Sequence, residues 1–438
     1  MYKVCKIRSL AIVISCGSIL LTACGGGSND SPATQTPSTG TTPTVSGSVG
    51  SQSGTTPTPN FKINAATSYS RQNTTEPTDV GTLLKTNGLS GYYFDARQYV
   101  DLDGDGVNEI IVAPGQDVTT ASPVHIYKKQ ANGSYVDATS SLISGTIPGQ
   151  IHPRKVISAD FNGDGLPDLY FVDHGYDHLP YPGAQNVLML SNKATGKLEN
   201  KSITGNPTAF QHCAAAGDID NNGSLDIFVC AEGFQGADKG PYFLKNNGSG
   251  DMTVSRMGIP ASISGSTNGL LAAELVDVDN DGFLDLVTSV RSGTSSGNSF
   301  ATTVFWGDGT GSFTDSRATT LPNPASFVAT YDIKAEDIDG DGRRDLVLLR
   351  VTADLQGYYF QILRQTSDRI FVDESIPRII KNASTWEGIG ADFFPWIHMK
   401  DLNGDGKIDL AIGDGTKFVP ARNFKWINDG TGVFNKLP

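Results

Sequence analysis

The sequence predicts an all-β fold made of repeated units of four antiparallel strands, and three observations predict it. Six acidic nonapeptides begin at intervals of 58 to 64 residues, and a fixed period of this kind is typical of a repeat architecture. Each nonapeptide is followed directly by an apolar run too short for a helix, which indicates a buried strand. Further along each unit, a turn lies between aromatic or aliphatic residues and indicates a hairpin, and in all units but the fifth this turn is rich in Gly and Asn.

The first residues of the chain have the features of an export signal. A short basic segment precedes an apolar stretch that is too short to span a bilayer stably. The stretch ends in LTAC, Leu21–Cys24, which resembles a bacterial lipobox. The resemblance implies a lipoprotein signal peptide over residues 1–23, cleavage before Cys24 and acylation of its thiol. The alternative is an ordinary signal peptide that happens to contain a cysteine.

Residues 24–60 consist mainly of Gly, Ser, Thr and Pro after the cysteine. Such a segment cannot bury a core, so we expect a disordered, solvated linker that carries the lipid-anchor Cys24. We expect contact with a membrane only through this lipid. Gly25 follows the cysteine and is not the Asp that marks inner-membrane retention in many Gram-negative lipoproteins. The resemblance therefore implies an extracytoplasmic outer-membrane lipoprotein that faces either the periplasm or the exterior.

The six nonapeptides share one pattern of oxygen-bearing side chains. Positions 1, 3 and 5 are always Asp or Asn, and position 9 is always Asp or Glu. Glycine at position 6 suits a sharp turn, but an EF-hand would need a Glu at position 12, where the first loop has Val112. The loops are Asp101–Glu109, Asp160–Asp168, Asp218–Asp226, Asp277–Asp285, Asp337–Asp345 and Asp401–Asp409.

These loops are predicted to be calcium sites. Five or six oxygens around one point suit Ca²⁺, whereas Mg²⁺ demands stricter octahedral geometry. The absence of Cys and His from the loops disfavours zinc and copper. The alternative, that these residues only make good turns, does not account for the six position-9 acids. The predicted ligands, with position 7 contributing its backbone carbonyl, are Asp101, Asp103, Asp105, Val107, Glu109, Asp160, Asn162, Asp164, Leu166, Asp168, Asp218, Asp220, Asn222, Ser224, Asp226, Asp277, Asp279, Asp281, Phe283, Asp285, Asp337, Asp339, Asp341, Arg343, Asp345, Asp401, Asn403, Asp405, Lys407 and Asp409.

Calcium would also explain the charge balance. The chain has a net charge of −13, and 21 of its 46 acidic residues lie in the six loops. Two carboxylates about 4 Å apart repel by roughly 4 kcal/mol at an effective dielectric constant near 20, so empty loops should be open or disordered. Up to six structural Ca²⁺ ions would offset most of the charge. The negative sign and the absence of a basic cluster argue against a nucleic-acid partner.

Each unit therefore contains a strand, the acidic loop, a second strand, a connection and a hairpin of two strands. Four-stranded units repeated around an axis form a β-propeller; a linear solenoid is the alternative, but its repeats are usually shorter. The units resemble FG-GAP or VCBS repeats, the blades of integrin-α-like propellers, and the resemblance implies calcium between the first two strands. Six repeats predict six blades in a domain over residues 61–438. Seven are possible if residues 61–90 add a degenerate blade.

Two cysteines remain in the repeat region, Cys213 and Cys230, on either side of the third acidic loop. In an antiparallel strand pair joined by that loop they lie opposite each other or one step apart. Cross-strand neighbours are within disulfide reach, and an exported protein meets an oxidising compartment. We therefore expect a Cys213–Cys230 disulfide; two packed free thiols are the alternative.

A candidate ligand face lies at the end of the blades opposite the acidic loops. The starts of the first strands and the connections after the second strands should gather there, and five of the six histidines map to these places. Aromatic and polar residues of this sort suit a protein or glycan ligand. The alternatives are side chains that only fill the mouth of the propeller, and a metal held by His174 and His178. The candidate residues are His152, Arg154, His174, Tyr176, Asp177, His178, Tyr181, His212 and Trp396.

Together these features predict a lipid-anchored, calcium-stabilised, extracytoplasmic β-propeller that acts as a binding or interaction module for a protein or a glycan. The alternative is a carbohydrate-active enzyme such as a polysaccharide lyase, which needs a base such as His or Tyr beside Arg or Lys. His152 with Arg154 could serve, although their spacing does not single them out. The sequence contains no nucleophile elbow, P-loop or dinucleotide fingerprint, and no residue is predicted to be catalytic.

Overall fold

The computed structural model describes residues 83, 86–89, 94–115, 119–236, 240–264, 268–292, 299–380, 388–390, 396–412 and 424–437. All of them belong to one compact unit, Asn60–Pro438. The predicted signal peptide, the lipid-anchor Cys24 and the linker lie outside the described residues. The same holds for most of residues 61–90, the segment that would supply a seventh blade.

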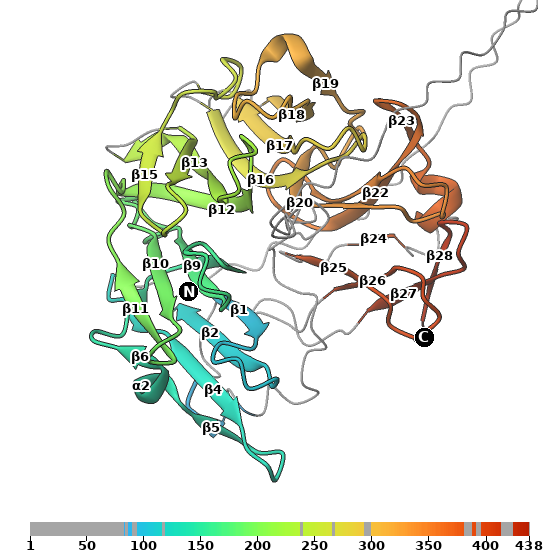
Figure 1. Ribbon diagram of the computed structural model, residues 1–438. Helices are drawn as coiled ribbons and strands as arrows, with labels where there is room; N and C mark the ends of the chain where they lie inside the picture. Colours follow the sequence, from blue (N-terminus) through green and yellow to red (C-terminus); the bar gives the residue numbers. More distant parts are fainter. Residues whose placement is uncertain are drawn as a thin grey trace, which may run out of the picture. The chain divides into compact units, whose positions relative to one another are not determined.

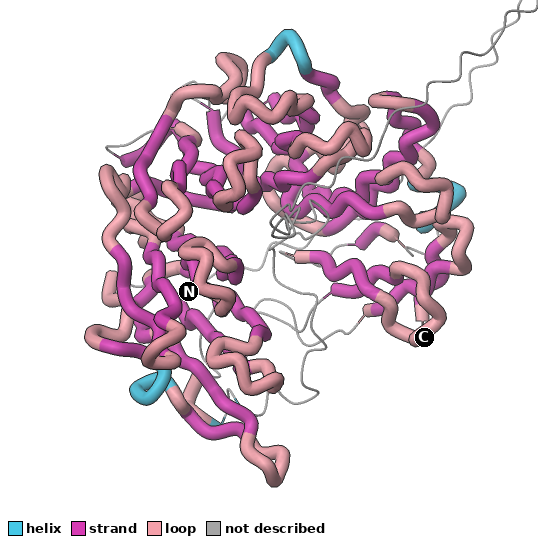
Figure 2. The backbone as a smooth tube through the Cα atoms, in the orientation of Figure 1, coloured by secondary structure: helices cyan, strands magenta, loops and turns pink. Residues whose placement is uncertain are grey.

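The described residues form six main antiparallel sheets that follow one another along the chain (Figures 1 and 2). Each sheet contains four strands in sequence order. The strands are, sheet by sheet, β1 (Phe94–Val100), β2 (Glu109–Gly115), β4 (His125–Lys129) and β5 (Tyr135–Asp137); β8 (Pro153–Ala159), β9 (Asp168–Asp173), β10 (Val187–Asn192) and β11 (Lys197–Lys201); β12 (Ala209–Gly217), β13 (Asp226–Gly236), β14 (Tyr242–Asn246) and β15 (Met252–Ser255); β16 (Asn268–Val276), β17 (Asp285–Ser292), β18 (Ser299–Phe305) and β19 (Ala318–Thr320); β20 (Ala329–Glu336), β21 (Asp345–Val351), β22 (Tyr358–Ser367) and β23 (Ile370–Asp373); and β25 (Ile397–Lys400), β26 (Asp409–Ile412), β27 (Lys425–Asn428) and β28 (Phe434–Lys436).

A few short elements are added to this plan. β6 (Ile143–Ser144) pairs in parallel with β11, and β24 (Ile389–Gly390) pairs with β22. β3 (Ser122–Pro123) and β7 (Gly149–Gln150) form a small sheet of their own. From residue 94 onward, the described helical elements are the single turns α2 (Thr139–Leu142), η1 (Asp315–Arg317) and η2 (Ile376–Ile380). Among the described residues, no helix is long and apolar enough to cross a bilayer.

The six sheets stand around a common centre in the order of the sequence (Figure 1), which is the arrangement of a six-bladed β-propeller. The first strands β1, β8, β12, β16, β20 and β25 pack against one another in that order. The predicted fold class and the predicted count of six blades are therefore confirmed. No seventh four-stranded sheet occurs in the part of the chain that the structure describes.

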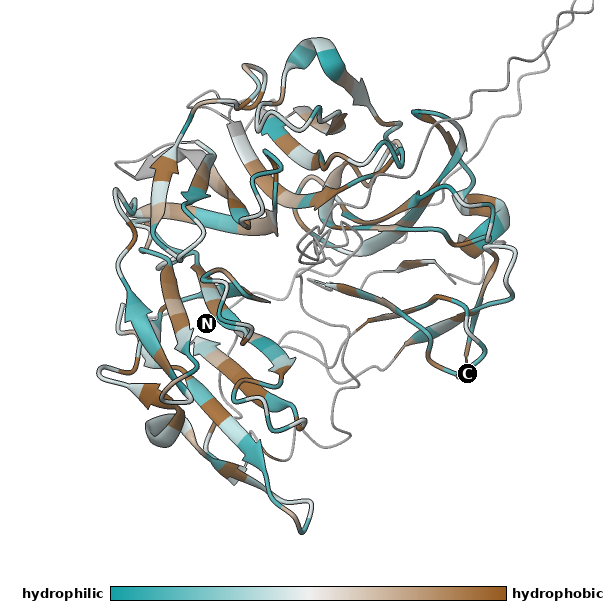
Figure 3. Cartoon of the chain, viewed as in Figure 1, coloured by the Kyte–Doolittle hydropathy of each residue, from teal (hydrophilic) through white to brown (hydrophobic). Residues whose placement is uncertain are grey.

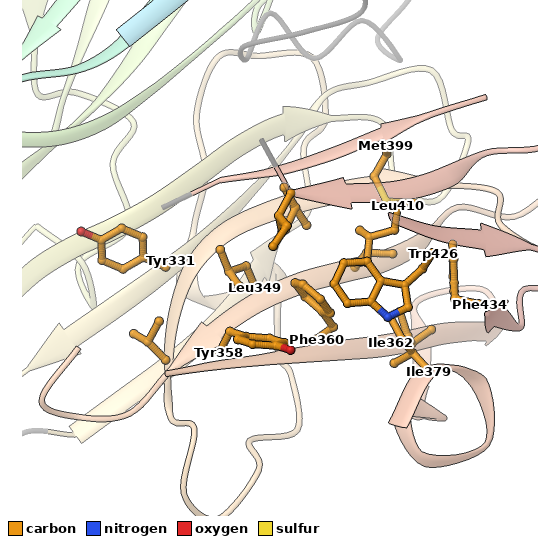
Figure 4. Packing of buried hydrophobic residues seen from close by; sticks show 14 of the residues in the cluster. Tyr331, Leu349, Tyr358, Phe360, Ile362, Ile379, Met399, Leu410, Trp426 and Phe434 are labelled. Carbon is orange, nitrogen blue, oxygen red and sulfur yellow. The ribbon is translucent and has the colours of Figure 1, made fainter. Parts of the chain in front are cut away.

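Hydrophobic side chains fill the spaces between neighbouring blades. Figure 3, in which the backbone is coloured by hydropathy, shows that the hydrophobic positions are concentrated in the strands. The second strands β2, β9 and β21 are buried along their whole length, which explains their unbroken apolar runs. Between the fifth and sixth blades, Trp426 packs edge-on against Phe360 with ring centroids 4.9 Å apart (Figure 4). Each such buried side chain contributes roughly 1.5–3 kcal/mol, so packing between blades stabilises the ring.

Candidate functional site

All six acidic loops join the first strand of a blade to the second, as the sequence predicts. The position-9 acid is the first residue of the second strand and pairs with the last residue of the first strand, as Glu109 does with Val100. Because the first strands follow one another around the ring, the loops share one end of the propeller, which we call the acidic end. The opposite end, where the first strands begin, is called the histidine end.

Two positions in each loop have backbone angles that only Gly and Asn adopt easily. Position 6 is Gly with φ between 80° and 93°, and position 4 is Gly or Asn with φ between 54° and 81°. This turn folds the loop back over the position-1 carboxylate. In the first loop, Asp101 accepts backbone N–H groups from Gly104, Asp105 and Gly106.

The position-9 acids have a role that the sequence pattern did not reveal. All six are 0% exposed. In the last loop, one oxygen of Asp409 accepts the N–H of Leu402 at 2.9 Å, and the other accepts the N–H of Asn428 on the third strand at 2.8 Å. Desolvation raises the pKa of Asp168 to about 6 and that of Asp285 to about 8. Position 9 therefore joins the loop, the second strand and the third strand.

Carboxylates at positions 1, 3 and 9 come together in the first, fourth and fifth loops. In each group, one oxygen per residue lies within 4.8 Å of the others, as for Asp277, Asp279 and Asp285. Several buried carboxylate oxygens have no hydrogen-bond partner within the described chain, and burying such atoms is unfavourable unless a donor or cation satisfies them. They are Asp103 Oδ1, Glu109 Oε1, Asp220 Oδ1 and Asp339 Oδ1. The residues thus fit a hard, oxygen-liganded cation, and the side chains at positions 1, 3 and 9 would hold it.

The third-strand residue opposite position 9 is basic in alternate blades. The first, third and fifth blades have Lys128, Lys245 and Arg364 there, and each contacts acids of its own loop. Lys245 Nζ lies 2.5 Å from an oxygen of Asp220 and also contacts Asp226. The other three blades have apolar residues at this place. These residues are Leu190, Trp306 and Ile427.

Basic residues also join loops to the following blade. Arg369, at the turn of the β22–β23 hairpin, lies 2.6 Å from Asp279 in the loop of the preceding blade. The turn contains no glycine, and Arg369 itself adopts a φ of 59°. Arg378, in η2, lies 3.1 Å from Asp339 in the loop of its own blade and donates Nη1 to the carbonyl of Thr431 in the sixth blade. Internal cations therefore compensate part of the negative charge at the acidic end, a feature that the sequence analysis missed.

A buried amide side chain connects neighbouring blades at three places. In the sixth blade, Asn428 donates its backbone N–H to Asp409 of its own loop and its Nδ2 to the carbonyl of Ile338 in the preceding loop at 2.8 Å. Asn246 and Gln365 make the same pair of bonds in the third and fifth blades. The equivalent residues of the second and fourth blades, Ser191 and Gly307, are too short. The amides therefore link the loop of the second blade to that of the third, and the loops of the fourth, fifth and sixth blades to one another.

Four predicted ligand-face residues form one buried group at the histidine end. His152, Arg154, His174 and His212 are each at most 6% exposed. The Nε2 atoms of His174 and His212 are 2.9 Å apart, and the guanidinium of Arg154 lies 3.5 Å from a ring nitrogen of His152 and of His212. We call these four residues the histidine cluster. Burial, with the charge of Arg154 as a smaller cause, holds the pKa of His152 and His212 well below the usual value.

Tyr331 joins the cluster from the fifth blade and was not predicted. Its hydroxyl lies 2.5 Å from Arg154, whose guanidinium is also 5.9 Å from the ring centroid of Trp396. Arg154, His212 and Tyr331 each lie six residues before the first acid of their own loop. Equal positions on three first strands therefore meet at the centre of the ring, and this register is the signal that could have found Tyr331.

The other predicted ligand-face residues lie nearer the surface. Asp177 and His178 are exposed, whereas Tyr176 and Tyr181 are half-buried. The rings of Tyr176 and His178 are 4.9 Å apart. At this end, His152, His174 and Asp177 each offer one ligand atom within 4.8 Å of the others.

The predicted disulfide is confirmed. Cys213 on β12 and Cys230 on β13 are directly paired in the register of the two strands, with Cα atoms 4.9 Å apart, and their sulfurs are bonded. The bond links the first two strands of the third blade on either side of its acidic loop.

Comparison with known proteins agrees with the fold and the loops. A family model described as FG-GAP-like repeat matches residues 101–171 and 218–288. The chain is 25% identical over 194 residues to Cartilage acidic protein 1 of Mus musculus, a match that covers 42% of this chain and 28% of the relative. It is 24% identical over 201 residues to Cartilage acidic protein 1 of Xenopus tropicalis, covering 44% and 29%. Each match spans less than a third of the relative's length. The six sheets and the family model together describe a β-propeller in which residues 101–171 and 218–288 match FG-GAP-like repeats.

Proposed function

We propose that this chain is a calcium-stabilised β-propeller that acts as an extracytoplasmic binding module. The observation that carries the calcium assignment is the convergence of position 1, 3 and 9 carboxylates in three loops, with buried oxygens that lack a hydrogen-bond partner among the described residues. Calcium would supply these oxygens with a flexible coordination partner. Its role would be structural, because the position-9 acid connects the loop to two strands of its blade.

The binding role is supported by the opposite end of the ring. Side chains from the second, third and fifth blades meet there around Arg154, and the half-buried or exposed rings of Tyr176, His178 and Tyr181 lie in one connection. Convergent polar groups beside aromatic side chains are typical of ligand sites. The module would take a glycan or a protein, and nothing in its basic residues suggests nucleic acid.

The proposal places the module on a membrane through lipidated Cys24, in the outer membrane. The lipobox-like LTAC and the Gly25 that follows it support this assignment. Metabolic labelling with palmitate should modify the wild-type chain and leave Cys24→Ser unlabelled. A wild-type chain that takes up no lipid in a Gram-negative host would contradict the proposed lipid anchor. The assignment of the β-propeller would not be affected.

A polysaccharide lyase is the second candidate, and one observation favours it. His152 is held in its neutral form beside Arg154, with Nε2 3.5 Å from Nη1, and a neutral imidazole is the form that a general base needs. However, His152 is only 1% exposed. A lyase would generate unsaturated sugar ends from an acidic polysaccharide, and His152→Ala would abolish this product.

The main test combines metal content with ligand binding. Native mass spectrometry of the ectodomain (residues 61–438) prepared with calcium should show several bound Ca²⁺ ions, and a glycan array and a panel of surface proteins should show binding by the calcium-loaded form. Chelation should abolish that binding. An ectodomain without stoichiometric calcium would overturn the metal assignment, and a calcium-loaded ectodomain that retains no glycan or protein would overturn the binding role.

A further inference from the structure

A buried guanidinium without a carboxylate partner lies in the histidine cluster. Arg154 is 6% exposed, and within the described residues its polar contacts are all neutral: the hydroxyl of Tyr331 and one ring nitrogen each of His152 and His212. Its Nε has no hydrogen-bond partner in this part of the chain. Burying an unpaired charge is strongly unfavourable. An anionic group bound here would therefore be stabilised by both charge and hydrogen bonds.

Arg154 also decides which ring nitrogens carry hydrogen. A guanidinium only donates, so His212 Nδ1, which faces it, is an acceptor. Neutral His212 then carries its hydrogen on Nε2 and donates it to His174 Nε2 at 2.9 Å. His174 is left with its hydrogen on Nδ1, and this nitrogen is buried without a partner among the described residues. These roles are assigned from the hydrogen-bond geometry, and they make the cluster a set of N–H donors.

Among the described residues, no carboxylate near the cluster contacts the guanidinium of Arg154. Burial, followed by His212, His152 and Arg154, keeps the pKa of His174 well below 6.5, so the imidazole is neutral at pH 7. Asp173 is also buried, but its oxygens accept the backbone N–H groups of Ile151, His152 and Gly175. Asp177 is exposed on the connection that covers the cluster. Arg291, from the fourth blade, adds a second positive charge near His212.

We propose that the histidine cluster binds an oxyanion carried by a sugar, either a uronate carboxylate or a sulfate ester of an acidic glycan. This inference rests on the proposed binding function and names the chemical class of its ligand. Carboxylates and sulfates have paired oxygens that match the N–H groups of a guanidinium. The rings of Tyr176, Tyr181 and Trp396 provide apolar surface for the sugar ring beside the charge. A glycan therefore fits this chemistry better than an acidic peptide does.

A transition metal is the competing ligand of the same residues. His152, His174 and Asp177 offer three ligand atoms within 4.8 Å of one another, and imidazole with carboxylate suits several divalent metals. The guanidinium of Arg154 would repel such an ion, and the hydrogen on His174 Nδ1 occupies the lone pair that a metal needs. Asp177→Asn separates the two cases, because it removes a metal ligand but also removes a negative charge that opposes an anion.

The first experiment needs no variant. Calorimetry on the calcium-loaded ectodomain would compare an oligogalacturonide with the same oligosaccharide after methyl esterification, and a sulfated oligosaccharide with its desulfated form. We expect the charged member of at least one pair to bind at least tenfold more tightly, and the pair that shows the difference identifies carboxylate or sulfate as the ligand group. Equal binding within both pairs would overturn the inference while leaving the binding function in place.

Variants then locate the site. Arg154→Met should weaken binding of the charged oligosaccharide at least tenfold, and His174→Gln should weaken it severalfold. Arg256→Met is the matched control, because Arg256 also lies over a tyrosine ring, that of Tyr242, but on the third blade away from the cluster. If Arg154→Met does not fold, His174→Gln and the comparison of the oligogalacturonide with its methyl ester still test whether the histidine cluster binds the anion.

Three further outcomes would overturn the inference. Unchanged affinity in folded Arg154→Met and His174→Gln would place the anion elsewhere. Tight Zn²⁺ binding by the wild type that Asp177→Asn abolishes would assign the cluster to a metal. Binding of an acidic peptide but of no charged oligosaccharide would assign the site to protein. Asp177→Asn should instead bind the charged oligosaccharide as tightly as the wild type does, or more tightly.

Discussion

The two ends of the propeller bury charge in different ways. At the acidic end, every blade has one buried carboxylate at position 9. Most of these carboxylates accept backbone N–H groups from both the loop and the third strand, as Asp409 does from Leu402 and Asn428. At the histidine end, the buried charge of Arg154 occurs once and contacts only neutral groups within the described chain. The first arrangement repeats with the fold, whereas the second belongs to a few residues from different blades.

The difference separates the repeated contacts that stabilise each blade from the single guanidinium that we propose binds a ligand. A feature present in all six loops acts on every blade, so its loss should destabilise the whole propeller. A feature present once has no such general structural role, and its contacts with neutral groups leave hydrogen-bonding capacity for a ligand. Function is therefore to be sought where the repeats differ. The predictions that follow test this division, from the largest expected effect to the smallest.

Chelation should have the largest effect, because it would return the clustered carboxylates of all six loops to mutual repulsion. We expect the melting temperature of the ectodomain to fall by more than about 10 °C in excess chelator and to recover on addition of Ca²⁺, since a bound ion stabilises the folded state by mass action. Differential scanning calorimetry measures the shift. An unchanged melting temperature in excess chelator would contradict the proposal that calcium stabilises the propeller.

Removing a single position-9 acid should have the next largest effect on stability. Asp285→Ala leaves the buried N–H groups of Val278 and Gly307 without their acceptor, and each unsatisfied group costs roughly 1–3 kcal/mol. We expect the free energy of unfolding to fall by about 3 kcal/mol in urea titrations. Asp308→Ala, which removes a half-buried acid that pairs with Arg317, is the control and should change it by less than about 1 kcal/mol.

The amide that joins neighbouring blades should contribute less. Asn428→Ala removes the bonds from Nδ2 to the carbonyls of Ile338 in the preceding blade and Ile408, and the two N–H groups that Oδ1 accepts from the β27–β28 turn. The backbone bond to Asp409 remains. We expect a loss of about 2 kcal/mol in the free energy of unfolding, because the freed turn groups can reach water whereas the buried carbonyls are left unpaired. Asn247→Ala, in an exposed turn, is the comparison. Equal effects of the two variants would argue against the network between blades.

The histidine end should make stability depend on pH with a defined sign. The pKa of His174 is lowered by burial and by His212, His152 and Arg154, so below pH 6.5 the unfolded chain takes up a proton that the folded chain does not. Stability is therefore full above about pH 6.5 and falls as the pH decreases, by about 1 kcal/mol per pH unit for one such histidine. His174→Gln should show a shallower acid slope than the wild type, with calcium saturating; identical slopes would contradict the prediction.

The basic residues of alternate blades should have the smallest effect. Lys245 Nζ contacts Asp220 and Asp226, where it would compete with the calcium ion that we propose. Lys245→Met should therefore raise the calcium affinity of the third loop severalfold, and Ile427→Lys should lower that of the sixth. Calcium titrations followed by calorimetry would resolve both changes. An affinity that falls in Lys245→Met would show that the lysine supports the loop rather than competing with calcium.

Much of the acidic end could be predicted because its information is local. The apolar runs next to the acidic nonapeptides predicted that each loop joins two strands, and the turn glycines predicted the hairpins. The positions of the two cysteines on either side of one loop predicted the Cys213–Cys230 bond. The sequence did not reveal that Lys245 reaches into its loop or that Asn428 reaches the preceding blade. Both contacts join residues that are distant in sequence, and no local pattern specifies which side chain will lie opposite which.

The sequence by itself determined the repeat, the strand order within a blade, the oxygen-rich loops and the six-fold count, because each depends on a period or on backbone angles that a few residue types impose. Only the tertiary structure decided which histidines meet, that Tyr331 joins Arg154, and that this guanidinium is buried among neutral groups. The physical reason is that these contacts form across the ring. They exist only once packing between blades has fixed where each first strand begins.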